Sequence, residues 1–284
     1  NGSCEELRGC SLGTDTTDCD EACSGPWTEE IVGACAHDQA SWKPARPKVE
    51  IGSGGVGGVT GAWDGVLSAR GRNQGETLQR HYRVYVPKSY DPQIPMPVFL
   101  VLGGFTVEQY TLPEYTELNR TADLGNFIVV YADPDYRNFG GEIGWVYAWY
   151  VYQNAWQGGW SSNPDIDFLT KLVGHLKGLY NVDCTRVFIS GHSRGAGLAM
   201  MATFERPDVF AGFAAQAGFV TVNHYDTRLE EIGSQVKRTG VLLHGIADPD
   251  VNVGNSDRAS EVLTSLGWVH GVDYLYYRLP EVTH

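Results

Sequence analysis

One serine of the sequence has a setting typical of a catalytic nucleophile. Gly191, Ser193 and Gly195 form the pattern Gly-x-Ser-x-Gly, preceded by the apolar run RVFIS and followed by the small-residue run GAGLAMM. A sharp turn from a strand into a helix would lift the serine hydroxyl clear of the sheet, and glycine on both sides removes Cβ atoms that would clash there. The pattern therefore predicts a nucleophilic serine at position 193 rather than an ordinary turn with an idle hydroxyl.

A nucleophilic serine needs a base that takes its proton and a carboxylate that orients the base. After a turn of this kind, the carboxylate and then the histidine follow the serine along the chain. Asp248 comes just after the strand-like run VLLHG, and ligand-facing residues of open α/β sheets lie at the carboxyl ends of strands. Asp248 is the predicted carboxylate, with Asp250 as the alternative.

Several histidines are candidates for the base. Those that follow the serine are His224, His244, His270 and His284. His244 lies within a predicted strand, which favours a buried structural role, and His270 is expected at the end of a helix, where a cation would cap the last carbonyls. His192, beside the serine, would point the wrong way for a general base.

The carbonyl oxygen of a substrate gains negative charge when a serine attacks, and two backbone N–H groups are needed to stabilise it. Arg194, directly after Ser193, is expected to donate one from the start of its helix. The Phe105 amide is the second predicted donor, because Phe105 lies in a loop that follows the apolar run PVFLVL. Gly104 in this loop either lets the backbone approach a substrate closely or simply forms a turn.

Aromatic residues are concentrated between Tyr136 and Trp160, where nine of twenty-five residues are aromatic against 12% in the whole chain. If this segment is helical, several of them form one narrow stripe. Such a stripe either packs in the core or lines a groove that stacks on sugar rings or on a phenolic acyl group. The candidate substrate-binding aromatics are Trp145, Trp149, Trp156 and Trp160.

The elements that must position these residues alternate along the chain. Short apolar runs at 97–102, 127–131, 186–190 and 241–244 are typical of parallel strands buried on both faces, and 80–87 alternates as a strand does. Residues 166–180 and 257–268 have the apolar spacing of amphipathic helices. This alternation predicts an α/β fold, a mostly parallel sheet with helices on both faces.

The composition excludes several protein classes. Hydrophobic residues make up 42% and charged residues 19% of the 284, so the chain has enough apolar side chains for a folded core. No apolar run is long enough to span a bilayer. The net charge of −13 argues against binding to nucleic acid. We therefore expect neither a membrane nor a nucleic-acid partner.

The N-terminal part differs from the rest in charge and cysteine content. Residues 1–38 contain nine acidic residues and one basic residue, and the first 48 residues hold five of the six cysteines: Cys4, Cys10, Cys19, Cys23 and Cys35. This pattern predicts disulfides in an exported protein, and the spacing disfavours zinc, the competing hypothesis. Because five N-terminal cysteines leave one without a partner among themselves, Cys184 is predicted to form a disulfide with one of these five. Residues 49–62 are rich in glycine, which favours a flexible linker, with an extended strap as the alternative.

Four stretches of the chain resemble one known family. RHYRVYVPKSYDPQIPMPVFLVLGG, VDCTRVFISGHSRGAGLAM, ERPDVFAGFAAQAG and LLHGIADPDV are similar to the extracellular α/β-hydrolases that group feruloyl and acetylxylan esterases with polyhydroxybutyrate-depolymerase-like enzymes. The resemblance covers residues 63–284 and implies an α/β-hydrolase fold with the triad Ser193, Asp248 and His284. The family usually has His-Gly where this chain has Gly103-Gly104, and its members continue beyond the late histidine.

The sequence predicts a secreted, monomeric serine esterase in three parts: an acidic disulfide-rich segment at 1–48, a linker or strap at 49–62 and a catalytic domain at 63–284. The resemblance implies feruloyl or acetyl esters of plant cell-wall polysaccharide as substrates, and no cofactor or metal is expected. A polyhydroxyalkanoate depolymerase or oligomer hydrolase is the alternative enzyme. A non-catalytic glycan-binding module on a hydrolase scaffold is the alternative of another class.

Overall fold

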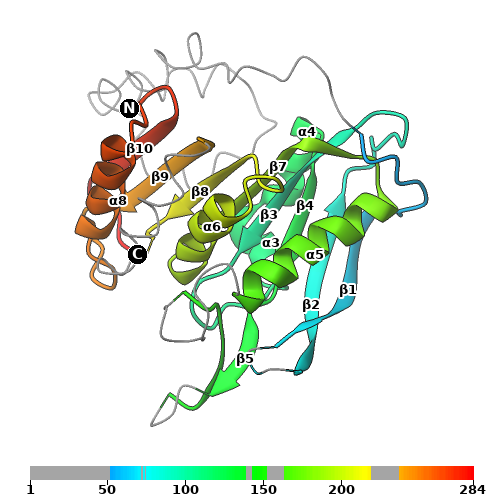
Figure 1. Ribbon diagram of the computed structural model, residues 1–284, viewed down its shortest axis with the longest axis horizontal. Helices are drawn as coiled ribbons and strands as arrows, with labels where there is room; N and C mark the ends of the chain where they lie inside the picture. Colours follow the sequence, from blue (N-terminus) through cyan, green and yellow to red (C-terminus); the bar gives the residue numbers. More distant parts are fainter. Residues whose placement is uncertain (1–51, 72, 74, 139–142, 152–162, 219–236) are drawn as a thin grey trace, which may run out of the picture. The chain divides into compact units, whose positions relative to one another are not determined.

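The computed structural model describes residues 52–71, 73, 75–138, 143–151, 163–218 and 237–284, all of them in one compact unit (Figure 1). The five N-terminal cysteines, Trp156, Trp160 and His224 lie outside the described residues. In the part of the chain that is described, no helix is long and apolar enough to cross a membrane.

One eight-stranded sheet forms the centre of the unit, in the order β1-β2-β4-β3-β7-β8-β9-β10 (Figure 1). β1 and β2 are antiparallel to each other, β2 is antiparallel to β4, and the strands from β4 to β10 are parallel to their neighbours. The strands are β1 Gly61–Arg70, β2 Thr77–Val86, β3 Met96–Leu102, β4 Ile128–Ala132, β7 Val182–His192, β8 Gly212–Gln216, β9 Thr239–Gly245 and β10 Tyr274–Leu279.

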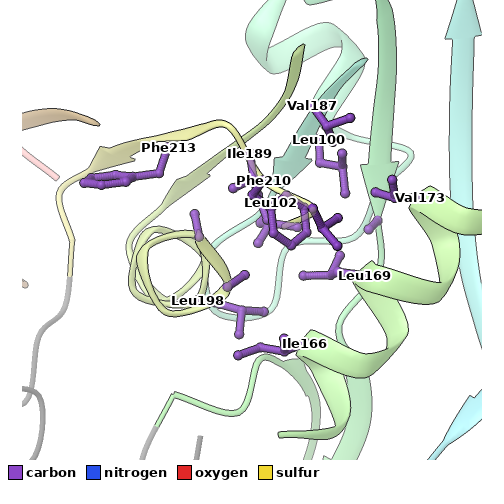
Figure 2. Close-up of a cluster of buried hydrophobic side chains, with 14 of the residues drawn as sticks. Leu100, Leu102, Ile166, Leu169, Val173, Val187, Ile189, Leu198, Phe210 and Phe213 are labelled. Atoms are coloured by element: carbon purple, nitrogen blue, oxygen red, sulfur yellow. The ribbon is translucent and has the colours of Figure 1, made fainter. Parts of the chain in front are cut away.

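Helices cover both faces of the sheet, as the alternation of elements predicts. α5 (Pro164–Leu179), α6 (Arg194–Glu205) and α8 (Gly254–Ser265) pack through the main apolar cluster. Figure 2 shows part of it, in which side chains of β3 and β7 meet those of α5 and α6. α3 (Leu112–Thr116) and α4 (Leu118–Gly125) pack through a second cluster, which includes Val101 and Val129. The predicted mostly parallel α/β architecture is confirmed.

The carboxyl ends of β3, β7 and β9 carry the three segments that the sequence analysis singled out. β3 ends at Leu102 before the Gly103–Phe105 loop, β7 leads into Ser193, and β9 ends three residues before Asp248. Because these strands are parallel members of one sheet, their ends open at the same edge. That edge holds the candidate site.

The glycine-rich stretch differs from the flexible linker that its composition favours. From Gly52 to Val59 it is packed along the segment between α5 and β7, with hydrogen bonds from the Ser53 amide to the Val182 carbonyl and from the Tyr180 hydroxyl to the Val59 carbonyl. A Cβ at Gly58 would lie 1.9 Å from the Tyr180 ring. Glycine is thus required here for close packing, and these residues form a strap.

β5 (Asp135–Asn138) and β6 (Trp145–Ala148) form a separate antiparallel hairpin. The helical stripe considered for the aromatic segment is therefore wrong, because Trp145 lies in a strand. Alternation along the strands puts Tyr136, Trp145 and Tyr147 on one face of the hairpin and Arg137 on the other.

Cys184 lies near the start of β7, at the opposite end of the strand from Ser193. Its side chain is half-buried, and it pairs with no cysteine among the described residues. Since the five N-terminal cysteines are outside that set, its pairing with one of them stays a prediction.

Candidate active site

Ser193 occupies a strained turn between β7 and α6. Its φ and ψ are 54° and −117°, in a region that residues with a side chain rarely adopt. Its amide donates to the Gln216 carbonyl at 2.8 Å, and its carbonyl accepts from the Ala196 amide in the first turn of α6. The turn is thus held by hydrogen bonds on both sides of the strained residue.

The two glycines of the motif let three backbone segments meet at this turn. A Cβ at Gly191 would lie 2.2 Å from the carbonyl of Gly195, and a Cβ at Gly195 would lie 2.5 Å from the carbonyl oxygen of Gly103. Both distances are far shorter than any real contact of a Cβ atom, and the atoms met are backbone. The close packing joins the start of α6 to the loop after β3.

Asp248 and His284 form a hydrogen-bonded pair at the same edge of the sheet. His284 Nδ1 lies 2.8 Å from Asp248 Oδ2. The other carboxylate oxygen, Oδ1, accepts the amides of Asp250 and Val251, each at 2.8 Å. The carboxyl side chain is fully buried, whereas the His284 ring is 19% exposed. The loop after β9 therefore fixes the carboxylate, and the carboxylate fixes the imidazole.

Hydrogen bonding decides the charge of Asp248. Burial by itself would raise the pKa of this carboxyl, but the bonds from the Val251 amide, His284 and the Asp250 amide hold its pKa below the ordinary value. The group is thus ionised at neutral pH. An ionised carboxylate at Nδ1 favours the tautomer of His284 that leaves Nε2 free to accept a proton.

The other histidines have different roles. His244 is buried as predicted, with its Nδ1 2.7 Å from Ser256 Oγ and its Nε2 2.9 Å from the Val251 carbonyl. The helix-capping role expected for His270 is wrong, because α8 ends earlier, at Ser265, and His270 Nε2 accepts the Tyr276 amide.

His192 lies at the site itself. Its ring centroid is 4.6 Å from that of His284. Burial first, and then the nearby His284, hold the pKa of His192 below its ordinary value, so its ring is neutral at neutral pH. His284 therefore rests against an uncharged ring one residue before Ser193. Among the described residues, the Ser193 hydroxyl has no hydrogen-bond partner in this state.

The loop after β3 lies directly against Ser193. A Cβ at Gly104 would be 3.4 Å from both Ser193 Cβ and His192 Nδ1. The guanidinium of Arg194 lies over the Phe105 ring, 4.9 Å from its centroid. The two residues predicted to donate amides, Phe105 and Arg194, are thus neighbours beside the serine.

The candidate aromatics have unequal positions. Trp149 is fully buried, and its indole N–H donates to the Gly103 carbonyl at 2.9 Å, so the expectation that it contacts substrate is wrong. Trp145 is 59% exposed and stacks on Tyr136, their ring centroids 5.6 Å apart. Tyr147 lies 4.9 Å from Tyr136 on the same face. The period-two spacing of Trp145 and Tyr147 is the sequence signal that could have identified this face.

One group of side chains in the described part of the chain brings three metal-ligating atoms together. Atoms of Asp248, Asp250 and His284 lie within 4.8 Å of one another. The Asp248 carboxylate, however, already accepts two amides and the imidazole. This arrangement favours a carboxylate that orients an imidazole over a cation site. A strained serine at a helix start, a histidine–carboxylate pair and a loop packed against the serine can together carry out nucleophilic acyl transfer.

Comparison with known proteins agrees with this chemistry. The family model Esterase, described as "Putative esterase", matches residues 77–256. "Putative esterase NocK" from Nocardia uniformis subsp. tsuyamanensis is 27% identical over 187 residues, which are 60% of this chain and 45% of that protein. The chain thus spans about half the length of this curated relative.

Solved structures similar to this chain include several esterases. A ferulic acid esterase matches with a TM-score of 0.58 and 15% identity, covering 78% of this chain and 90% of that one. The acetyl xylan esterase from Aspergillus awamori matches with a TM-score of 0.58 and 13% identity, covering 78% and 94%. At these identities the likeness concerns the fold, which is that of the α/β-hydrolases.

Proposed function

The chain belongs to the Esterase family, and from that premise we propose that it is a serine hydrolase of carboxylic esters that works through an acyl-enzyme. The observation that carries this proposal is the pair of Asp248 and His284, hydrogen-bonded at 2.8 Å and held against the residue that precedes the strained Ser193. A binding protein would have no need for an ionised carboxylate that orients an imidazole beside a strained serine.

In the proposed reaction, Ser193 Oγ attacks the ester carbonyl carbon while His284 Nε2 takes the hydroxyl proton. Asp248 stabilises the imidazolium that forms. The carbonyl oxygen becomes an oxyanion that accepts the amides of Phe105 and Arg194. When the tetrahedral intermediate collapses, the C–O bond to the alcohol breaks and His284 gives its proton to the leaving oxygen. The same imidazole then takes a proton from water as the water attacks the acyl carbon. The bond from that carbon to Ser193 Oγ breaks, His284 returns the proton to Oγ, and the free acid leaves.

Labelling and substitution of Ser193 test this mechanism. Diethyl p-nitrophenyl phosphate is expected to label Ser193 of the parent, and Ser193→Ala is expected to lose hydrolysis of p-nitrophenyl acetate with an unchanged melting temperature. Ser190→Ala is the matched control, because Ser190 lies on β7, three residues before Ser193, and is buried. Turnover by Ser193→Ala equal to that of the parent would refute the mechanism, whereas a parent with neither turnover nor labelling would favour the glycan-binding hypothesis.

The proposed substrates are feruloyl or acetyl esters of plant cell-wall polysaccharide, processed by a secreted enzyme. The support for a carbohydrate is the exposed face of the hairpin, where Tyr136, Trp145 and Tyr147 form a continuous aromatic surface. Exposed aromatic rings of this kind stack on sugar rings or on a phenolic acyl group. The Tyr147 carbonyl accepts the Thr106 amide, so this surface is attached directly to the loop beside Ser193.

A substrate panel measured on the parent and on Trp145→Ala tests the substrate class. An aromatic contact contributes about 0.5–1.5 kcal/mol beyond area burial, so we expect a loss of about 2- to 12-fold in kcat/KM on feruloylated arabinoxylan or acetylated xylan. Hydrolysis of p-nitrophenyl acetate by the same variant is the internal control and should be unchanged. Equal losses on all substrates would contradict a role in carbohydrate binding, and a preference for hydroxybutyrate oligomers would favour the depolymerase.

A further inference from the structure

Two hydrogen bonds hold the loop beside Ser193 from one side. The Trp149 indole N–H donates to the carbonyl oxygen of Gly103 at 2.9 Å, and the Thr106 amide donates to the carbonyl oxygen of Tyr147 at 2.9 Å. Phe105 lies between the two bonded residues of the loop. Both anchors come from the end of β6, so one short segment fixes the loop on either side of the proposed oxyanion donor.

The anchored carbonyl of Gly103 is also packed against the nucleophile turn. A Cβ at Gly195 would lie 2.5 Å from this oxygen, and Gly195 is the second residue of α6. Thr106 has a φ of 67°, which a β-branched residue rarely adopts. The loop is therefore held in a strained conformation between the start of α6 and the end of β6, and its anchors are what maintains that conformation.

Trp149 is itself held in place by a buried polar cluster. The Tyr150 amide donates to Asp165 Oδ2 at 2.6 Å, and the Asn163 side chain donates to the Tyr150 carbonyl at 2.8 Å. Asp165 forms an ion pair with Arg80 at 2.7 Å, and both side chains are at most 2% exposed. The Arg80 guanidinium lies 5.6 Å from the centroid of the Trp149 ring. Residues at the start of α5 and in β2 thus hold the segment that carries the indole.

We propose that Trp149 is a positioning residue of the oxyanion hole. Its N–H holds the Gly103 carbonyl so that the amide of Phe105 faces the reacting carbonyl, and the Arg80–Asp165 cluster keeps the indole in that orientation. This inference rests on the proposed esterase function, since it assigns a role to Trp149 in stabilising the oxyanion. Trp149 contacts no substrate, so it acts on the rate only through the loop.

Trp149→Phe tests the proposal, because it keeps an aromatic ring in the core and removes the N–H. Loss of a complete oxyanion donor lowers kcat by about 10²- to 10³-fold. In Trp149→Phe the Phe105 amide is displaced but still present, so we expect kcat to fall by only about 10- to 30-fold. The KM for p-nitrophenyl acetate should change less than twofold. The rate constant for inactivation by diethyl p-nitrophenyl phosphate should fall by a similar factor, because its phosphoryl oxygen gains charge in the same place.

Trp268→Phe is the matched control. Trp268 is also buried, at 1% exposed, but it packs against Phe204 at the other end of α6. We expect this variant to lose melting temperature with little change in kcat. If Trp149→Phe retains kcat within twofold of an active parent, the inference is wrong. A parent that shows no hydrolysis and no labelling of Ser193 would instead refute the proposed function.

A second pair of variants decides the matter if Trp149→Phe does not fold. Trp149→Gln and Trp149→Met leave cavities of similar size, but only glutamine carries an N–H donor of comparable reach. The inference requires kcat of the glutamine variant to exceed that of the methionine variant by several-fold at similar melting temperatures. Equal kcat values would mean that Trp149 contributes only by filling space.

Discussion

Asp248→Asn separates the orienting role of the carboxylate from its role in the loop. Two backbone amides bind Oδ1 at 2.8 Å, and His284 Nδ1 lies 2.8 Å from Oδ2. An asparagine keeps both amide bonds only if its carbonyl oxygen takes the place of Oδ1. Its NH₂ group must then face His284, and since two donors cannot pair, the imidazole must turn or adopt the tautomer with the proton on Nε2.

The wrong tautomer cannot accept the serine proton, and in the serine-protease triad the same exchange lowers kcat by about 10⁴-fold. We expect a loss of the same order here, which is about 5 kcal/mol of transition-state stabilisation at 1.36 kcal/mol per tenfold. The melting temperature should fall by only a few degrees, because the bonds to the loop remain.

The assay is single-substrate kinetics with p-nitrophenyl acetate at pH 8, with thermal unfolding of each variant in parallel. Asp250→Asn is the matched control, because Asp250 is the neighbouring acid and its side chain is exposed. This change should leave kcat within about twofold. If Asp248→Asn retained more than a tenth of the parent's kcat, or if Asp250→Asn caused the larger loss, the assignment of Asp248 would be refuted.

Three further outcomes follow from other parts of the structure. Gly104→Ala should fold normally but lower kcat/KM, because its methyl group would lie 3.4 Å from Ser193 Cβ. Gly195→Ala should lower the melting temperature strongly, because its Cβ would lie 2.5 Å from backbone atoms. Equal melting temperatures of the two variants would contradict this expectation. Burial raises the pKa of Asp133 to about 7, although the Gln109 amide opposes this, so the folded state holds a proton that the unfolded chain releases near pH 4. The free energy of unfolding of the parent therefore falls as the pH rises towards 7. Urea unfolding should show that the free energy of unfolding of Asp133→Asn, relative to the parent, increases by up to about 3 kcal/mol between pH 5 and pH 8. A difference that does not change with pH would contradict this expectation. Non-reducing peptide mapping of exported protein should find Cys184 linked to an N-terminal cysteine, and a free thiol at Cys184 would refute that pairing.

The parts of the site that could be predicted from the sequence are those with local signatures. The Gly-x-Ser-x-Gly turn is specified within five residues, because glycine is needed at 191 and 195 wherever three backbone segments meet so closely. The buried strands were also predictable, since a strand covered on both faces is a continuous apolar run. β1 and β8 were not predicted. β8 is the short stretch GFAAQ, and β1 is an edge strand whose side chains are mostly half-exposed or exposed, so neither has a strong pattern.

The role of Trp149 could not be predicted because its partners are distant in the sequence. The Gly103 carbonyl is 46 residues away, and the buried pair that supports the segment joins Arg80 to Asp165. Helical spacing of the tryptophans suggested one stripe, but the spacing cannot distinguish a helix from a hairpin that ends in a buried tryptophan. Only the tertiary packing decides between a ring that meets substrate and a ring that supports a loop.

The β5–β6 hairpin has a consequence for how such an enzyme changes during evolution or in the laboratory. Its outward face consists of side chains, Tyr136, Trp145 and Tyr147, whereas its support of the loop comes from the Tyr147 backbone and from Trp149. Substitutions at positions 136 and 145 should therefore leave the hydrogen bonds that hold the loop beside Ser193 unchanged. A library that varies these two positions and leaves 147–149 intact should yield altered substrate preference at nearly constant turnover on small esters. The hairpin thus makes selectivity an evolvable property that is largely independent of the catalytic rate.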